Sequence, residues 1–190
     1  NGINLFNIKT KSINYLNPGQ KGKHYLPFRE IRDIFEDSNG IFWIGSLNNG
    51  LLKYNPENGD HKIYQHDPKD PESLSNNLVW KIFQDSYGNF WVGTNNGLNR
   101  FDPETGTFEH FKYDPDDIYS LGNNTIFSIY EDSRRNVWFC TYTSLSKYLP
   151  GKDVFYNYKH EGENPYSLSV SSTFSVFENS DGILWIATMG

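Results

Sequence analysis

The segment Asp85–Thr94, which reads DSYGNFWVGT, is one of four similar copies of a motif in this chain. The other three copies occupy residues 37–46, 132–141 and 179–188, and each copy has tryptophan at its seventh position. The tryptophans therefore recur every 47 or 48 residues. A fixed period of this length indicates a repeat architecture, so the repeat has to be defined before any single residue is interpreted.

Each complete repeat contains four short segments that are rich in aromatic and β-branched residues. In the second complete repeat these segments cover residues 79–85, 89–94, 97–101 and 107–111, and Gly, Asn, Asp or Pro separates them. This pattern is typical of β-strands joined by turns, and none of the segments has the apolar period of a helix. We name the four segments a, b, c and d, and we expect each repeat to form one four-stranded antiparallel sheet.

Segment b indicates how these sheets pack. Phe90 and Val92 alternate with Trp91 and Gly93, so both faces of the strand are apolar and the sheet must be covered on both sides. Sheets of four strands that cover one another, at about 47 residues per repeat, describe the blades of a β-propeller better than a solenoid or tandem immunoglobulin-like domains. A small residue stands two positions after each tryptophan, which fits a close approach between blades: Gly45, Gly93, Cys140 and Ala187.

The chain begins with segments c and d and ends with segments a and b. We therefore expect an all-β propeller fragment with a half-blade and linker at residues 1–28, complete blades at 29–77, 78–124 and 125–171, and a half-blade at 172–190. The two half-blades are complementary. Within one chain they would close a four-blade ring, between two chains they would close an eight-blade ring, and in a larger propeller neighbouring blades would cover them.

The connections from segment d to the next segment a are long and acidic. One leucine stands in each connection and is expected to pin the loop to the core, and these leucines are Leu26, Leu74, Leu121 and Leu168. Solvent-exposed loop residues are the expected role of the acidic side chains. Calcium binding is a possible second role, but the spacing of a calcium-binding loop is absent.

Composition restricts the classes of function. The 190 residues carry a formal net charge of −6, which does not suit nucleic-acid binding. Cys140 is the only cysteine, so an internal disulfide is excluded and the thiol is expected to fill buried space. The five histidines lack metal-ligand spacing, and neither a metal nor another cofactor is expected. No apolar run reaches membrane-spanning length, so we expect no membrane contact by this fragment.

Residues 85–106 resemble the two-component regulator propeller repeat. They read Asp-Ser-x-Gly-x-x-Trp-x-Gly-Thr, followed by Asn-Asn-Gly-Leu-x-Arg-Phe-Asp-Pro-x-Thr-Gly. The resemblance implies a segment of the periplasmic sensor domain of a Bacteroidetes hybrid two-component system, whose parent chain is anchored in the inner membrane and carries a histidine kinase and a response regulator. It also implies sensing of oligosaccharides released from polysaccharides, without enzymatic activity in this fragment.

Positions at which the repeats differ are the best candidates for recognition. The second position of segment a differs among the repeats and is expected to line the channel of a propeller, and the b-to-c loops reach the same face. Aromatic rings beside polar groups suit the apolar face and the hydroxyl groups of a sugar. Ordinary packing between blades would also explain the aromatic residues. The predicted ligand-binding set is Arg32, Trp80, Lys81, Asn95, Asn96, Phe127 and Phe174.

Two other functions remain open from the sequence. One is a protein-interaction scaffold in which the propeller mainly mediates dimerisation. The other is a catalytic propeller, either a glycosidase or a lyase, and paired carboxylates could serve glycoside hydrolysis. Expected partners are therefore an oligosaccharide and either further blades or a second copy of the chain.

Overall fold

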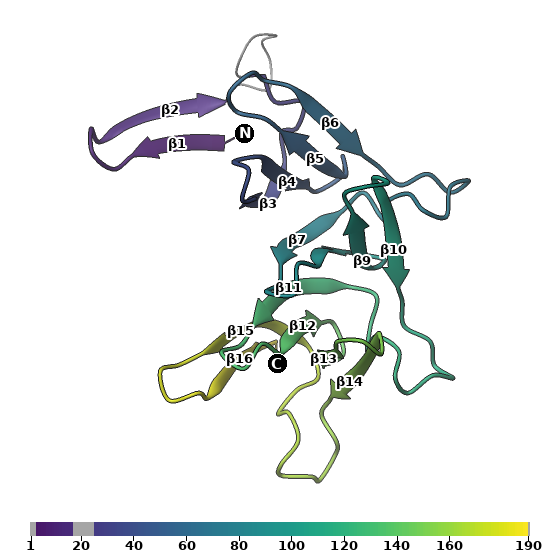
Figure 1. Ribbon diagram of the computed structural model, residues 1–190. Coiled ribbons are helices and arrows are strands. Elements are labelled where there is room, and N and C mark those ends of the chain that lie inside the picture. The colour runs from purple at the N-terminus through teal and green to yellow at the C-terminus, as the bar shows by residue number, and fades with distance from the viewer. Residues whose placement is uncertain (1–2, 17–24, 190) are drawn as a thin grey trace.

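A computed structural model describes residues 3–16 and 25–189 of the chain. This part is built from sixteen β-strands and contains no helix. The strands form three four-stranded antiparallel sheets and two two-stranded hairpins, which follow one another as an open fan (Figure 1). The expected class, an all-β fragment of a propeller, is confirmed. Residues 1, 2, 17–24 and 190, which belong to the expected half-blades and linker, lie outside the described residues.

Every sheet joins its strands in chain order, so each pair of neighbours is a hairpin. The N-terminal hairpin pairs β1 (Ile3–Asn7) with β2 (Ser12–Leu16). Blade 1 contains β3 (Ile31–Glu36), β4 (Phe42–Ser46), β5 (Leu51–Tyr54) and β6 (His61–Tyr64). Blade 2 contains β7 (Val79–Gln84), β8 (Phe90–Thr94), β9 (Gly97–Asp102) and β10 (Thr107–Phe111). Blade 3 contains β11 (Ile126–Glu131), β12 (Val137–Thr141), β13 (Leu145–Leu149) and β14 (Val154–Tyr158). The C-terminal hairpin pairs β15 (Thr173–Glu178) with β16 (Leu184–Thr188).

The repeated Asp-to-Trp motif is a structural turn between the first two strands of a blade. In blade 2, Asp85 Oδ1 accepts the backbone N–H groups of Tyr87 and Asn89 at 3.0 and 2.8 Å, and its Oδ2 accepts the indole N–H of Trp91 at 2.7 Å. The same indole bond joins Asp132 to Trp138 at 2.8 Å. One carboxylate therefore fixes both the turn and the orientation of the buried ring, and the carboxylate is fully used within the blade.

The Asp132 carboxylate makes stability depend on pH. Burial acts to raise the pKa of Asp132, but hydrogen bonds from Trp138 and Asn136 outweigh it and hold that pKa below the ordinary value. A carboxylate with a lowered pKa stabilises the folded state above its unfolded pKa of about 3.9, and this contribution is lost as the pH falls through the folded pKa.

Asp132→Asn should therefore cost about 1–3 kcal/mol at neutral pH, because the amide keeps only one acceptor oxygen, so either the indole N–H of Trp138 or the turn N–H groups of Arg134 and Asn136 face an NH2 donor instead. The loss relative to the unchanged chain should shrink as the pH falls below about 4. Thermal unfolding curves recorded between neutral and acidic pH test this, with the exposed Asp116→Asn as the matched control. A loss of equal size at both ends of the pH range would contradict the role assigned to the carboxylate.

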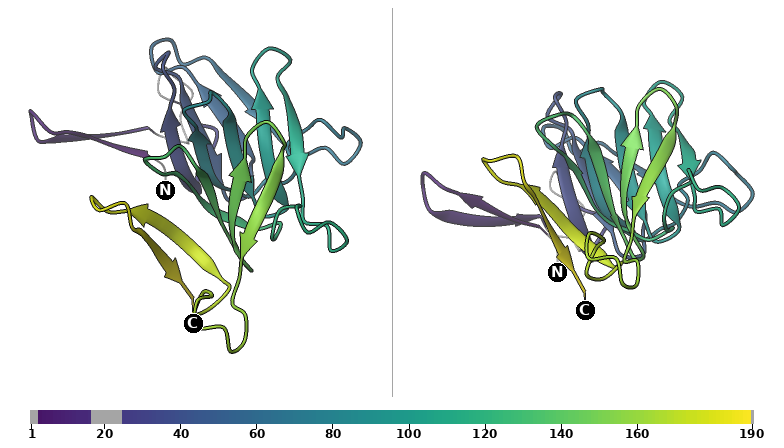
Figure 2. Two further views of the ribbon diagram at one scale, coloured as in Figure 1. Left: turned by 60° about the horizontal axis from the view of Figure 1, so that its bottom comes forward. Right: turned by 90° about the horizontal axis from the view of Figure 1, so that it is seen from below.

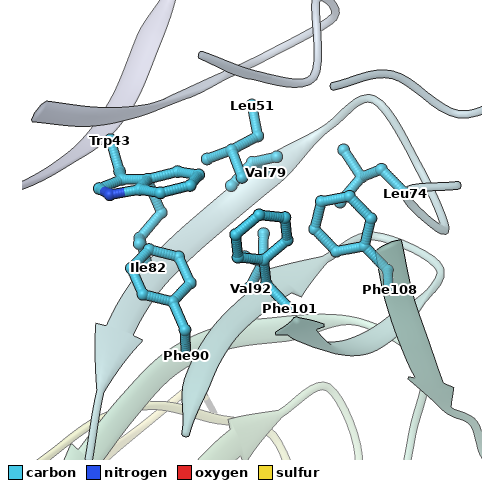
Figure 3. Close-up of a cluster of buried hydrophobic side chains, with 9 residues drawn as sticks. All are labelled: Trp43, Leu51, Leu74, Val79, Ile82, Phe90, Val92, Phe101 and Phe108. Atoms are coloured by element: carbon cyan, nitrogen blue, oxygen red, sulfur yellow. The ribbon is translucent and has the colours of Figure 1, made fainter. Parts of the chain in front are cut away.

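The hydrophobic core lies between neighbouring blades rather than inside each sheet. Figure 3 shows the cluster between blades 1 and 2, where Trp43 and Leu51 of blade 1 face Phe90, Phe101 and Phe108 of blade 2. An equivalent cluster joins blade 2 to blade 3. Each blade therefore depends on its neighbour for the burial of its apolar face, as the two apolar faces of segment b predict.

The small residue after each tryptophan allows this close approach. A Cβ atom added at Gly45 would lie 2.6 Å from Val79 Cγ1, and one added at Gly93 would lie 2.8 Å from Ile126 Cγ2. Cys140 occupies the third position and is fully buried. Burial raises the pKa of the Cys140 thiol to about 12, although a hydrogen bond with Thr173 acts in the opposite direction. The expected space-filling role of this cysteine agrees with its environment.

Three of the four loop leucines are fully buried, namely Leu26, Leu74 and Leu121. Leu74 packs in the cluster between blades 1 and 2, and Leu121 packs in the cluster between blades 2 and 3. Leu168 is only half-buried, beside the C-terminal hairpin. The expectation that these leucines pin the loops to the core is confirmed for Leu26, Leu74 and Leu121. Each of these three residues precedes a complete four-stranded blade, whereas Leu168 precedes the two-stranded C-terminal hairpin.

Candidate functional site

The first strand of each blade carries a β-bulge at its second residue. Pairing with the next strand skips from Ile31 to Asp33 in β3 and from Val79 to Lys81 in β7. Strands β11 and β15 have the same irregularity at the same position. A bulge leaves one residue out of the hydrogen-bonded ladder and redirects its side chain. The four bulge residues, which we call the bulge row, are Arg32, Trp80, Phe127 and Phe174.

The four residues of the bulge row contact one another from blade to blade. The Arg32 guanidinium lies 5.0 Å from the ring centroid of Trp80. Trp80 meets Phe127 edge to face, with centroids 5.3 Å apart, and Phe127 stacks on Phe174 at 4.3 Å with an angle of 15° between the rings. Strands β3, β7, β11 and β15 lie along the inner side of the fan, and the fourth strands lie along its outer side (Figure 1). The bulge row therefore runs along the side that faces the axis of the fan.

The indole of Trp80 has an unused donor. Its Nε1 atom is buried and finds no acceptor among residues 3–16 and 25–189. Most buried donors in proteins are paired, so this exception needs a reason. The tryptophans that pack in the two complete blade interfaces, Trp43 and Trp91, have their indole N–H groups bonded to Asp37 and Asp85. An acceptor supplied from outside the described residues would satisfy Trp80.

Lys81 lies next to Trp80 but already has a partner in the neighbouring blade. Its Nζ atom is 3.1 Å from Asp33 Oδ1, and Asp33 Oδ2 accepts the backbone N–H of Ile82 at 2.7 Å. This ion pair joins blades 1 and 2, and both side chains are partly buried. The structure therefore gives Lys81 a role in blade packing, and its role in ligand binding stays a prediction.

Asn95 and Asn96 are exposed in the turn between β8 and β9. The backbone N–H of Asn95 donates to the carbonyl of Leu78 at 3.1 Å, so this turn lies beside the start of β7, where Trp80 stands. No contact between either asparagine side chain and the bulge row is seen in the described part of the chain. Their role in binding also stays a prediction.

Tyr142 belongs beside the bulge row, although the predicted set omitted it. It is exposed in the loop that corresponds to that of Asn95, and its ring centroid lies 6.4 Å from that of Phe127. The sequence offers one signal for this residue, because Tyr142 is aromatic where the preceding repeat has Asn95 at the equivalent loop position. Within the described ranges, no group of three or more His, Cys, Asp or Glu side chains is arranged to hold a metal ion. No helix in those ranges is long and apolar enough to span a membrane.

Comparison with known proteins identifies the repeat. Residues 25–48, 73–96 and 120–143 match the family described as two component regulator propeller. Over 90 residues the chain is 31% identical to histidine kinase P4 of Formosa agariphila, and this match covers 47% of the chain and 7% of that protein.

Solved structures share the fold. The extracellular domain named for the hybrid two component system BT4673 of B. thetaiotaomicron superposes with a TM-score of 0.77 at 22% identity, covering 99% of this chain and 24% of that one. The corresponding domain of BT3049 gives a TM-score of 0.56 at 20% identity, with 100% and 36% covered. PorZ of Porphyromonas gingivalis, a surface component of the type-IX secretion system, gives 0.69 at 16% identity, with 96% and 27% covered.

The match thus covers 7% of the length of histidine kinase P4, and the chain covers between 24% and 36% of these solved chains. None of these proteins is named as a glycosidase or a lyase. The repeats that match the family are those that form the blades, since each match includes the first two strands of a sheet. Three segments of the chain thus match the two component regulator propeller family, one in each four-stranded sheet.

Proposed function

We propose that the chain is a segment of the periplasmic sensor domain of a hybrid two-component system, and that its bulge row binds an oligosaccharide. The parent protein, anchored in the inner membrane, would report the availability of a polysaccharide through its histidine kinase and response regulator. The names of histidine kinase P4 and of the two extracellular domains support the sensor assignment.

The bulge row is the observation that carries the ligand proposal. A blade needs its tryptophan, its turn carboxylate and its small residue, and the repeats keep these with few changes. The bulge position holds Arg32 in one blade and aromatic rings in the next three, so the requirements of the fold do not dictate its identity. Differences of this kind at one equivalent position suit the recognition of an asymmetric ligand.

The chemistry of the row suits a sugar chain. Arg32 at one end and Phe174 at the other are exposed, while Trp80 and Phe127 between them are half-buried. An aromatic ring can cover the apolar face of a pyranose, and a guanidinium or an indole N–H can donate to hydroxyl or carboxylate oxygens. Because the row crosses the first strands of four successive repeats, an elongated ligand fits it better than a single sugar.

A thermal-shift screen of oligosaccharides against the 190-residue chain tests the proposal. A ligand present at 100 times its Kd should stabilise the fold by about 2.7 kcal/mol, which raises the Tm measurably. Arg32→Ala changes an exposed residue of the row and should reduce or abolish the shift without unfolding the chain.

Three outcomes would overturn the proposal. The absence of a shift with any oligosaccharide, together with concentration-dependent dimerisation, would favour the scaffold function. A shift that Arg32→Ala and Trp80→Ala both leave unchanged would place the ligand elsewhere. Turnover of an oligosaccharide would identify a catalytic propeller.

A further inference from the structure

A groove lies between blades 1 and 2. Its volume is about 520 Å³, and its wall includes Lys53 of β5, Lys62 of β6 and Gly106 in the turn between β9 and β10. The sheets stand face to face along the fan (Figure 2), so two four-stranded blades form the two sides of the groove. The bulge row contributes no residue to this wall, so the groove is a separate place on the molecule.

The interface between blades 2 and 3 shows what the equivalent place holds there. Arg100 of β9 forms ion pairs with Glu109 at 2.6 Å and with Asp153 at 2.9 Å. Its Nη1 atom also donates to the hydroxyl oxygen of Tyr148 at 3.1 Å. Glu109 belongs to the same blade as Arg100, whereas Asp153 and Tyr148 belong to blade 3. The guanidinium is therefore held by acceptors from both sides of the interface.

The strand register identifies the two lysines of the groove as counterparts of Arg100 and Glu109. Lys53 pairs with Lys62 across β5 and β6, as Arg100 pairs with Glu109 across β9 and β10. Lys53 therefore stands in the place of Arg100, and Lys62 stands in the place of Glu109. Like charges directly opposite each other destabilise a sheet, so this pair of lysines is an exception that needs a reason.

Blade 2 also lacks the two acceptors that blade 3 supplies. Gly106 is the last residue before β10, as Asp153 is the last residue before β14. Phe101 pairs with the second residue of β10, as Tyr148 pairs with the second residue of β14. Neither Gly106 nor Phe101 has a side chain that can accept a hydrogen bond. All three side chains that accept from Arg100 therefore lack a counterpart between blades 1 and 2.

Two aromatic rings hold the lysine ammonium groups at this interface. Lys53 Nζ lies 5.2 Å from the ring centroid of Trp43, and Lys62 Nζ lies 4.6 Å from that of Tyr64. A ring face attracts a cation, but it replaces a negatively charged acceptor only weakly. Each ammonium group carries three N–H donors. The groove thus presents two cationic donors at defined positions.

The acidic side chains of the chain leave these lysines unpaired. Neither lysine forms an ion pair within residues 3–16 and 25–189, and the remaining residues include no Asp or Glu. Asp60 and Glu104 also line the groove, but Asp60 accepts the side-chain amide of Asn58 at 2.8 Å instead. The place that holds two bound carboxylates at the next interface therefore holds two cations and a groove here.

We propose that this groove binds an oxyanion, meaning a sulfate, phosphate or carboxylate group of a small molecule. The anion occupies the place that the Glu109 and Asp153 carboxylates occupy at the next interface, and Lys53 and Lys62 donate to its oxygen atoms. Such charge-assisted hydrogen bonds are about twice as strong as those between neutral groups. A groove of about 520 Å³ also has room for the molecule that carries the group. This site does not depend on the binding of an oligosaccharide by the bulge row.

Gly106→Asp tests the site by supplying the missing carboxylate within the chain. Gly106 has a φ angle of 77° and Asp153 has one of 54°, so aspartate already occupies the same left-handed conformation in blade 3. A Cβ atom added at Gly106 would lie 3.4 Å from Lys62 Nζ, which places the new carboxylate beside the lysines. Gly106→Asn is the matched control, because it has the same shape and no charge.

Titrations of the 190-residue chain, followed by two-dimensional amide NMR at constant ionic strength, measure the binding. Sodium sulfate tests a tetrahedral oxyanion, sodium glucuronate tests a carboxylate on a sugar ring, and glucose is the neutral control. We expect saturable shifts at Lys53, Lys62 and Gly106 with at least one of the two anions. Gly106→Asp should weaken that binding at least tenfold, whereas Gly106→Asn should leave Kd within about threefold.

Lysine variants carry the test if the substitutions at Gly106 reduce stability. Lys62→Gln should weaken the binding at least tenfold, whereas Lys69→Gln, which changes an exposed lysine of a connecting loop, should leave Kd unchanged. The absence of saturable binding with both anions would overturn the proposal. Equal Kd values in Gly106→Asp and Gly106→Asn, equal effects of the two lysine substitutions, or binding of glucose as tight as that of the anions would also overturn it.

Discussion

Leu121→Ala is expected to reduce the free energy of unfolding by about 2–5 kcal/mol, although the residue lies in a loop. Leu121 is fully buried and packs with Trp91, Phe139 and Tyr148 in the cluster between blades 2 and 3. Truncation removes apolar contacts and leaves a cavity that the packed rings cannot fill. The same connection carries no other fully buried apolar side chain, so its attachment to the core depends on this residue.

Leu168→Ala is the matched control for this prediction. Leu168 occupies the equivalent position in the next connection but is only half-buried. Its truncation should cost less than half as much as that of Leu121. Urea unfolding followed by tryptophan fluorescence measures both losses. Equal losses would contradict the view that a complete blade on each side determines the strength of the attachment.

Gly93→Cys is expected to cost about 1–3 kcal/mol, and Ile126→Thr is expected to recover part of that loss. An added Cβ at Gly93 would lie 2.8 Å from Ile126 Cγ2 and 3.3 Å from its carbonyl oxygen. The next interface has Cys140 at the position of Gly93 and Thr173 at the position of Ile126. The chain therefore contains both solutions to the same packing problem, Gly with Ile and Cys with Thr.

A double-mutant cycle measures whether these two positions act as a pair. Ile126→Thr alone should also destabilise the chain, because it places a hydroxyl in an apolar cluster. The double variant should be more stable than the sum of the single losses predicts, by about 1 kcal/mol or more. Strictly additive losses would show that the two interfaces are not equivalent.

Much of the fold could be predicted from the sequence because the repeat supplies its own comparison. The tryptophan spacing predicts the four-stranded sheets, and the alternation of Phe90 to Gly93 predicts burial on both faces. The small residues after tryptophan and the buried loop leucines follow from the same reasoning, and the structure confirms them at Gly45, Gly93 and Leu74. The domain limits stay a prediction.

The site could be predicted only in part, because its geometry depends on contacts between repeats. Sequence comparison places Arg32, Trp80, Phe127 and Phe174 at one equivalent position, but it cannot show that a bulge takes each residue out of the strand ladder. The ion pair of Lys81 was missed for a similar reason, because its partner Asp33 stands at the equivalent position of the preceding blade.

The proposed binding of an oligosaccharide depends on the bulge row. Calorimetric titration with the oligosaccharide that gives the largest thermal shift tests it most directly, using the unchanged chain, Trp80→Ala and Tyr87→Ala. Tyr87 is an exposed aromatic residue at the opposite end of the same strand pair, so its substitution controls for non-specific contact with rings. We predict that Trp80→Ala weakens binding at least tenfold and that Tyr87→Ala leaves Kd unchanged. An unchanged Kd in Trp80→Ala would contradict the proposal that the bulge row binds the oligosaccharide.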